Sequence, residues 1–138
     1  MGRVLAIDYG LKRTGIAVTD PLRIIATALE TVPTHTLLTF LKSYAQRETV
    51  DEFVIGMPKT LKNLDSEIAP QVRKFILVLK EHFPEKPIHE VDERFTSSMA
   101  HQAMIDGGMK KKDRQVKGNA DKISATIILQ SFLSAIKR

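Results

Sequence analysis

The chain has 138 residues, of which 43% are hydrophobic and 27% charged, a balance that excludes a disordered chain, a collagen-like repeat and a coiled coil. Twenty-one Lys and Arg against 16 Asp and Glu leave a net charge of +5, which weakly favours a polyanionic partner. The absence of Cys excludes disulfides and zinc fingers, and the lack of a long apolar run or secretory signal predicts a cytoplasmic protein without a membrane partner.

The first half of the chain predicts four strands and one helix. In chain order, we expect strands over residues 3–9, 15–19 and 24–32, a helix over 34–48 and a strand over 51–57. A short loop bounded by glycines separates the first two strands and predicts a hairpin. Thr34 or Thr36 is available as the N-cap of the helix.

The second half predicts three helices and one strand. In chain order, we expect a helix over 68–83, a strand over 88–93, a helix from Thr96 to Gly107-Gly108 and a helix from Asn119 to the C-terminus. Strands that first form a meander and then alternate with helices predict a mixed five-stranded sheet. We therefore expect one α/β domain over residues 1–138.

An acid ends the first predicted strand. Asp8 follows the apolar run Val4-Leu5-Ala6-Ile7, and a carboxylate there loses hydration, so it must be paired, protonated or bound to a metal. The alternative is a turn residue that accepts backbone N–H bonds from the loop after it. Position alone does not separate the two interpretations.

Three charged residues, Asp92-Glu93-Arg94, end the last predicted strand. Open α/β sheets bind ligands at the carboxyl ends of their strands. Consecutive strand residues point to opposite faces, so Asp92 and Glu93 cannot both face one site while the strand stays regular. Taken alone, the triplet favours an ordinary charged turn in which Arg94 pairs with a neighbour.

A third acid, Asp121, is predicted in the first turn of the last helix. It shares one side of that helix with Ser124, Ala125 and Ile128, a side that is partly apolar. An acid near a helix N-terminus also stabilises the helix dipole by about 0.3–1 kcal/mol. Alone, Asp121 fits that structural role better than a ligand role.

Together, the three acids at strand and helix ends predict a metal site. Converging carboxylates repel one another unless cations neutralise them, and oxygen ligands suit Mg²⁺ or Mn²⁺. Two such ions support the cleavage of phosphodiester bonds. His35, His82, His89 and His101 lack metal-ligand spacing and are interpreted as surface or packing residues.

Much of the positive charge lies in one segment before the last helix. Its cations are Lys110, Lys111, Lys112, Arg114 and Lys117. This density favours a phosphate-binding arm over a solvated loop.

Four ordered motifs across the chain resemble the YqgF family, also called RuvX, of RNase H-like proteins related to Holliday junction resolvases. They are the opening Val4–Gly10 with Lys12 and Thr14–Val18, then Val54–Pro58, Asp92–Ser97, and Lys117-Gly118 with Asp121, Ser124-Ala125, Ile127–Leu129 and Ser131-Phe132. The resemblance implies a three-layer RNase H-like fold and a metal site formed by Asp8, Glu93 and Asp121. Only the resemblance selects Glu93 over Asp92.

The family resemblance also implies a nucleic-acid substrate. Its members are associated with 5′-end maturation of pre-16S rRNA, and some with junction resolution, so pre-rRNA, branched DNA and the ribosome are the expected partners. Lys12, Arg94 and the basic arm are then expected to position the backbone. Residues 59–63 depart from the family pattern after Pro58, because they lack its glycine.

Two other functions use the same residues. Asp8-x-Gly10 followed by Gly15 resembles the phosphate loop of actin-like ATPases and sugar kinases, which need a second domain to close over nucleotide. A nucleic-acid-binding assembly factor with little turnover would keep the acids without using them. The expected oligomeric state is a monomer or, for a resolvase, a homodimer.

Overall fold

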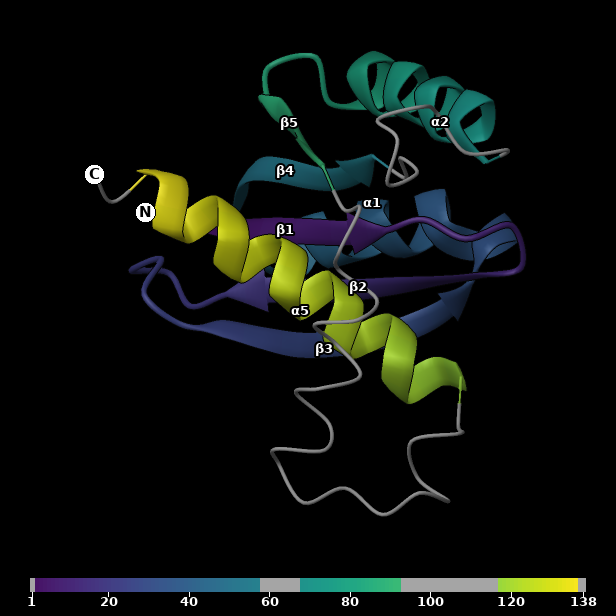
Figure 1. Ribbon diagram of the computed structural model, residues 1–138. Helices are drawn as coiled ribbons and strands as arrows, with labels where there is room; N and C mark the ends of the chain where they lie inside the picture. The colour runs from purple at the N-terminus through teal and green to yellow at the C-terminus, as the bar shows by residue number, and fades with distance from the viewer. Residues whose placement is uncertain (1, 58–67, 93–116, 137–138) are drawn as a thin grey trace.

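A computed structural model describes residues 2–57, 68–92 and 117–136 of the chain (Figure 1). The strands are β1 (Arg3–Asp8), β2 (Arg13–Thr19), β3 (Ala26–Pro33), β4 (Val50–Met57) and β5 (Ile88–Asp92). The helices are the 3₁₀ turn η1 (Thr34–Thr36), α1 (Leu37–Arg47), α2 (Ala69–His82) and α5 (Lys117–Ile136). The predicted helix from Thr96 to Gly107-Gly108 lies outside the described residues.

The five strands form one mixed sheet in the order β3-β2-β1-β4-β5. β1 and β2, and β2 and β3, are antiparallel, whereas β1 and β4, and β4 and β5, are parallel. This confirms the predicted mixed sheet. A connection through a helix brings the next strand back parallel, and α1 and α2 lie in these two crossovers.

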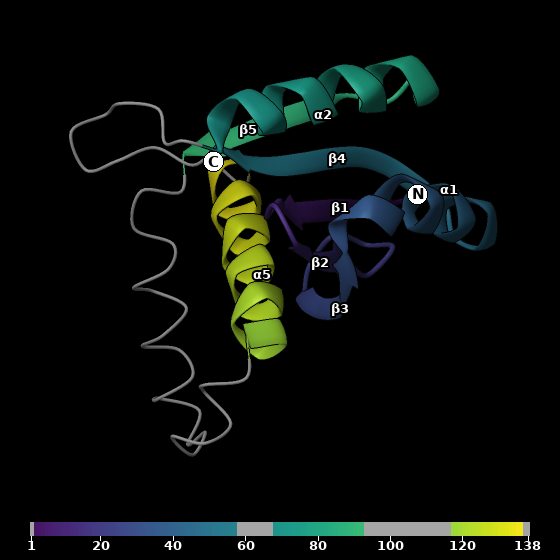
Figure 2. The same ribbon diagram turned by 90° about the vertical axis from the view of Figure 1, so that its right-hand side faces the viewer.

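Helices cover both faces of the sheet, which gives three layers (Figures 1 and 2). One face packs against α1 and α2 through large side chains, among them Leu5, Phe53 and Ile55. The other face packs against α5 and is lined by smaller residues, namely Val4, Ala6, Ala17 and Val54. These small side chains let α5 approach the sheet closely.

Two predicted boundaries were wrong for local reasons. The third strand begins at Ala26 rather than residue 24, because the Asp20 carboxylate accepts the N–H groups of Ile24 and Ile25, both at 2.8 Å, and holds them in a turn. The helix predicted over 34–48 opens as a 3₁₀ turn, and its N-cap residue, Thr36, makes no side-chain cap bond.

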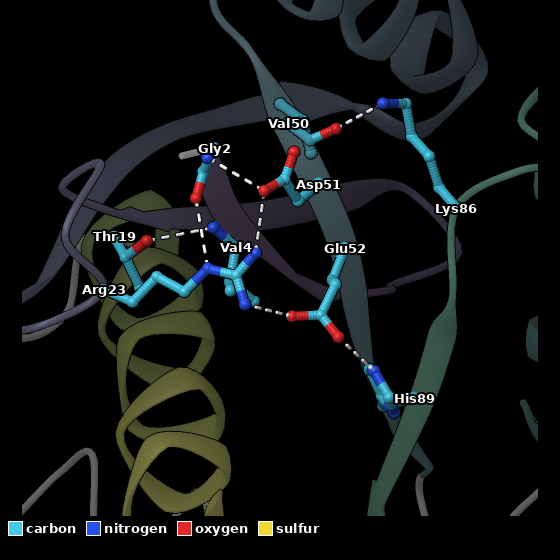
Figure 3. A network of polar contacts seen from close by, with 9 residues as sticks. All are labelled: Gly2, Val4, Thr19, Arg23, Val50, Asp51, Glu52, Lys86 and His89. Atoms are coloured by element: carbon cyan, nitrogen blue, oxygen red, sulfur yellow. Dashed lines mark hydrogen bonds and ion pairs between the residues drawn. The ribbon is translucent and has the colours of Figure 1, made fainter.

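A network of polar contacts closes the amino end of the sheet (Figure 3). The Arg23 guanidinium donates to Asp51 Oδ2 at 2.8 Å and to Glu52 Oε2 at 2.7 Å. The Gly2 N–H also donates to Asp51 Oδ2, at 2.8 Å, and His89 Nε2 lies 2.9 Å from Glu52 Oε1. The network ties the turn between β2 and β3 to β4 and β5.

Candidate functional site

The carboxyl ends of the three parallel strands meet at one edge of the sheet. β1 ends at Asp8, β4 at Met57 and β5 at Asp92, with Ile7 paired to Ile55 and Met57 paired to Asp92. Neighbouring strands lie about 4.8 Å apart, so the ends of β1 and β5 are separated by about 10 Å with β4 between them. The predicted meeting of the strand ends is therefore confirmed.

Strand alternation assigns Asp8 to the sheet face that α5 covers. Val4 and Ala6 are fully buried in the cluster on that face, and Asp8, two residues on, has the same parity and is half-buried. On β4, Val54 lies in the same cluster, so Gly56 belongs to that face and has no side chain there. At the level of Asp8, β4 therefore presents a buried glycine to the α5 face.

On β5 the odd-numbered residues contact the α5 side. The His89 ring packs against Phe132 of α5 with a centroid distance of 4.8 Å, and Val91 packs against the same cluster. Ile88 instead packs against the cluster on the α1 and α2 face. The prediction that His89 is a packing residue is confirmed.

The structure corrects the predicted position of Asp121. α5 begins at Lys117 rather than Asn119, so Asp121 is the fifth residue of the helix, and the first turn holds no acid. Three of the four residues predicted to share one helix side, Ser124, Ala125 and Ile128, are all buried. Asp121 occupies the position one turn before Ala125, and α5 runs opposite to β1, with its first turns toward the carboxyl end of that strand (Figure 1).

Only two of the predicted phosphate-binding residues lie in the part of the chain that the structure describes. Lys12 is exposed in the turn between β1 and β2, and Lys117 is the first residue of α5. Glu93 and the remaining cations lie outside the described residues, namely Arg94, Lys110, Lys111, Lys112 and Arg114. Within residues 2–57, 68–92 and 117–136, no cluster of three or more metal-ligating side chains is present.

The acids predicted from the sequence supply the oxygen ligands that a hard divalent cation prefers. Asp8, Asp121 and Glu93 offer carboxylate oxygens only, and this donor set suits Mg²⁺ or Mn²⁺. Two of these positions, Asp8 and Asp121, belong to the same side of the sheet. The residues therefore fit such an ion.

Sequence reasoning missed how the turn after Asp8 is held. Thr34 was one of two candidates for the helix N-cap, but its hydroxyl donates to the Gly10 carbonyl at 2.6 Å, and its N–H donates to the Lys12 carbonyl at 2.9 Å. These partners lie more than 20 residues away, and no local sequence signal points to them.

None of the described helices combines the length and the apolar character that a transmembrane span requires.

Comparison with solved structures defines the class of the fold. The chain is similar to the fowlpox virus resolvase, solved with its Holliday junction DNA substrate, with a TM-score of 0.61 and 12% identity over 99% of each chain. It is also similar to the Thermus thermophilus RuvC in complex with a Holliday junction, with a TM-score of 0.60, 16% identity, and coverage of 99% and 96% of the two chains. The protein has the RNase H-like fold of these resolvases, as predicted.

Sequence comparison defines the family. A family model described as "RuvX: Holliday junction resolvase" matches residues 2–135, and the chain belongs to this family. A relative from Phocaeicola vulgatus is 56% identical over 137 residues, which are 99% of each chain. One from Amoebophilus asiaticus is 52% identical over 138 residues, covering 100% of this chain and 98% of the relative. Both carry the name "Putative pre-16S rRNA nuclease".

Proposed function

We propose that this chain is a nuclease that hydrolyses phosphodiester bonds with Mg²⁺ or Mn²⁺ and matures the 5′ end of pre-16S rRNA in the cytoplasm. One observation carries the proposal: Asp8, at the carboxyl end of β1, and the Asp121 position, one turn before Ala125, belong to the same face of the sheet. Membership of the RuvX family supports nuclease activity. The name of the relatives supports pre-16S rRNA as the substrate.

The third ligand in this proposal is Glu93. Odd-numbered residues of β5 contact the α5 side, as His89 and Val91 do. Alternation carried one residue past the end of β5 favours Glu93 over Asp92 for that side.

The chain's own residues would divide the work as follows. Asp8, Glu93 and Asp121 would hold the cations, and a divalent ion bound there would lower the pKa of a water and stabilise charge on the leaving oxygen. Lys12 and Arg94 would contact phosphates next to the scissile bond. The basic segment Lys110–Lys117 would neutralise further phosphates of the strand.

The test replaces Asp8 with Asn and compares cleavage of an RNA carrying the 16S 5′ precursor sequence, with Mg²⁺ or Mn²⁺ present. We expect the rate to fall at least about 100-fold, because one charged ligand is lost while the side-chain volume is kept. The matched control is Glu90→Gln, which removes an exposed acid of β5 that has the parity of Ile88. Equal cleavage by Asp8→Asn and the wild type would contradict the proposal.

A second candidate is Holliday junction resolution, which the description of the family model and the RuvC-like fold favour. A resolvase cuts two arms of a symmetric junction and therefore needs two active sites, which predicts a homodimer. The same enzyme preparation is assayed on a four-way DNA junction, and its mass is measured in solution. Cleavage of the junction by a dimer, with the precursor RNA left intact, would replace the rRNA proposal.

The remaining hypothesis is that the protein is a ribosome-assembly factor that binds RNA without cleaving it. Such a protein would bind the precursor RNA equally well with and without the Asp8 carboxylate, and its affinity would fall steeply with salt. Binding without cleavage under every metal condition would favour it, with the pre-ribosomal particle as partner.

A further inference from the structure

Thr34 joins the end of β3 to the turn that follows Asp8. Its backbone N–H donates to the Lys12 carbonyl at 2.9 Å, and its hydroxyl donates to the Gly10 carbonyl at 2.6 Å. A single residue thus holds two of the four peptide groups in the turn 9–12.

A second threonine supports this contact from inside the sheet. The hydroxyl oxygens of Thr14 and Thr34 lie 2.9 Å apart, and Thr14 is fully buried on β2. Each hydroxyl carries one proton, and the proton of Thr34 is directed to Gly10, so Thr14 is the donor to Thr34. The hydrogen bonds therefore run in one direction, from Thr14 through Thr34 to the Gly10 carbonyl.

The turn itself has little room to move. A side chain at Gly10 would collide with the Arg13 carbonyl oxygen, so the close approach of these backbones requires glycine. The Tyr9 ring packs against Phe75 of α2 at a centroid distance of 5.3 Å. On the other side of the turn, Asp8 pairs with Gly15 across the hairpin.

The hydroxyl of Thr34 is used for the turn and not for the helix next to it. Thr34 opens η1, directly before α1, where a threonine commonly caps orphan N–H groups. Neither η1 nor α1 has a side-chain cap bond at its N-terminus. The Thr34 hydroxyl makes no cap bond and instead holds the loop beside Asp8.

We infer that Thr34 is a positioning residue for the cleavage reaction, an inference that rests on the proposed function. It acts through the turn: the Thr14–Thr34–Gly10 relay sets the backbone direction immediately after Asp8 and the point from which the exposed Lys12 meets a phosphate. Thr34 itself does not touch the substrate.

The test uses three variants at two neighbouring threonines. Thr34→Val keeps the shape and removes the hydroxyl, and Thr34→Ser restores it. Thr36→Val is the control, since the Thr36 hydroxyl donates within its own turn, to the Pro33 carbonyl at 2.8 Å. For Thr34→Val, we expect kcat on the precursor RNA with Mn²⁺ to fall about 10- to 100-fold, because a displaced catalytic group costs rates of this order. Thr34→Ser should recover to within about threefold, and Thr36→Val should match the wild type.

A purely structural role would lower the melting temperature but leave kcat unchanged well below it. A double-mutant cycle separates the two roles further. If the turn presents Lys12, then Lys12→Ala should cost less in the Thr34→Val background than in the wild type, whereas independent effects would add. Should Thr34→Val fail to fold, Thr14→Val decides: it keeps both bonds to the turn but removes the donor to Thr34, and should lower kcat several-fold.

The outcomes separate this inference from the function on which it rests. Full activity of Asp8→Asn would remove the proposed function, whatever Thr34 does. Loss of cleavage in Asp8→Asn together with a wild-type kcat in Thr34→Val, or in Thr14→Val where the first does not fold, would overturn the inference alone.

Discussion

The acids at the two ends of the central strands are arranged differently. At the amino end, Asp51 and Glu52 both accept hydrogen bonds from Arg23, and Asp51 also accepts the Gly2 N–H. At the carboxyl end, the acids of the proposed site come from separate elements, with Asp8 on β1 and Asp121 on α5. Arg23 of the same chain neutralises the first arrangement, whereas in the proposed function the second holds divalent cations.

A local irregularity makes the amino-end arrangement possible. Consecutive strand residues normally point to opposite faces, but the pairing of β1 with β4 shifts between Arg3 and Val4, so that Val50 and Glu52 have partners and Asp51 is the extra residue. This bulge lets Asp51 and Glu52 reach one guanidinium. The comparison predicts that substitutions at the amino end change stability, and those at the carboxyl end change activity.

The largest expected effect is at the carboxyl end and tests which acid of β5 serves the site. Glu93→Gln should lower the cleavage rate at least about 100-fold, whereas Asp92→Asn should keep it within about threefold, because the proposed function makes only Glu93 a metal ligand. Rates on the precursor RNA and urea midpoints are measured for both variants. Equal losses of cleavage rate in the two variants would show that the alternation of β5 does not continue as far as residue 93.

Sequence reasoning succeeded where one segment decides its own structure. The fourth strand and the second helix were predicted over 51–57 and 68–83, and the structure has Val50–Met57 and Ala69–His82. Each is an apolar run or stripe bounded by proline or polar residues. The start of β3 was missed because a carboxylate six residues upstream holds two β-branched residues in a turn.

The site was predictable in its residue types but not in its geometry. An acid after an apolar strand is visible in the sequence, which is why Asp8 was found. The proposed choice of Glu93 over Asp92 draws on the packing of His89 and Val91 against α5, which depends on two elements together. The contact of Thr34 is with a residue 24 positions away, so a local rule offered it only as one of two candidate helix caps.

The second prediction concerns Arg23, at the amino end. Arg23 adopts a left-handed backbone with a φ of 60°, which costs a non-glycine residue about 1–2 kcal/mol and is held by its side-chain bonds. Arg23→Ala should lower the free energy of unfolding by about 2 kcal/mol, since charge-assisted bonds are lost. Arg23→Gly should lose about 1 kcal/mol less, because glycine relieves the backbone. Urea denaturation measures both.

Cleavage by the folded Arg23 variants should stay within about twofold of the wild type, because the substitution lies at the other end of the sheet from Asp8. A loss of cleavage as large as that of Asp8→Asn, without unfolding, would break the division between the two ends. Equal stability of the Ala and Gly variants would instead remove the role of the backbone conformation.

The smallest expected effect is the pH dependence of the amino end. The Gly2 N–H bond, followed by the Arg23 guanidinium, holds the pKa of Asp51 below its ordinary value. Because the folded state binds this proton less readily than the unfolded chain, the stabilisation is complete above a pH of about 3.9 and is lost as the pH falls through the lower, folded pKa.

Urea midpoints of the wild type, Asp51→Asn and Glu81→Gln, measured between pH 7 and pH 2.5, check this prediction. Asp51→Asn should be less stable at pH 7, should lose less stability on acidification, and should approach the wild type at the acid end. Glu81→Gln replaces an exposed acid of α2 and should follow the wild-type curve. If Asp51→Asn instead loses as much stability with acid as the wild type, the Asp51 carboxylate does not couple the amino end to pH. Arg23 then stabilises this end through its hydrogen bonds to the Gly2 carbonyl, at 3.2 Å, and to Glu52.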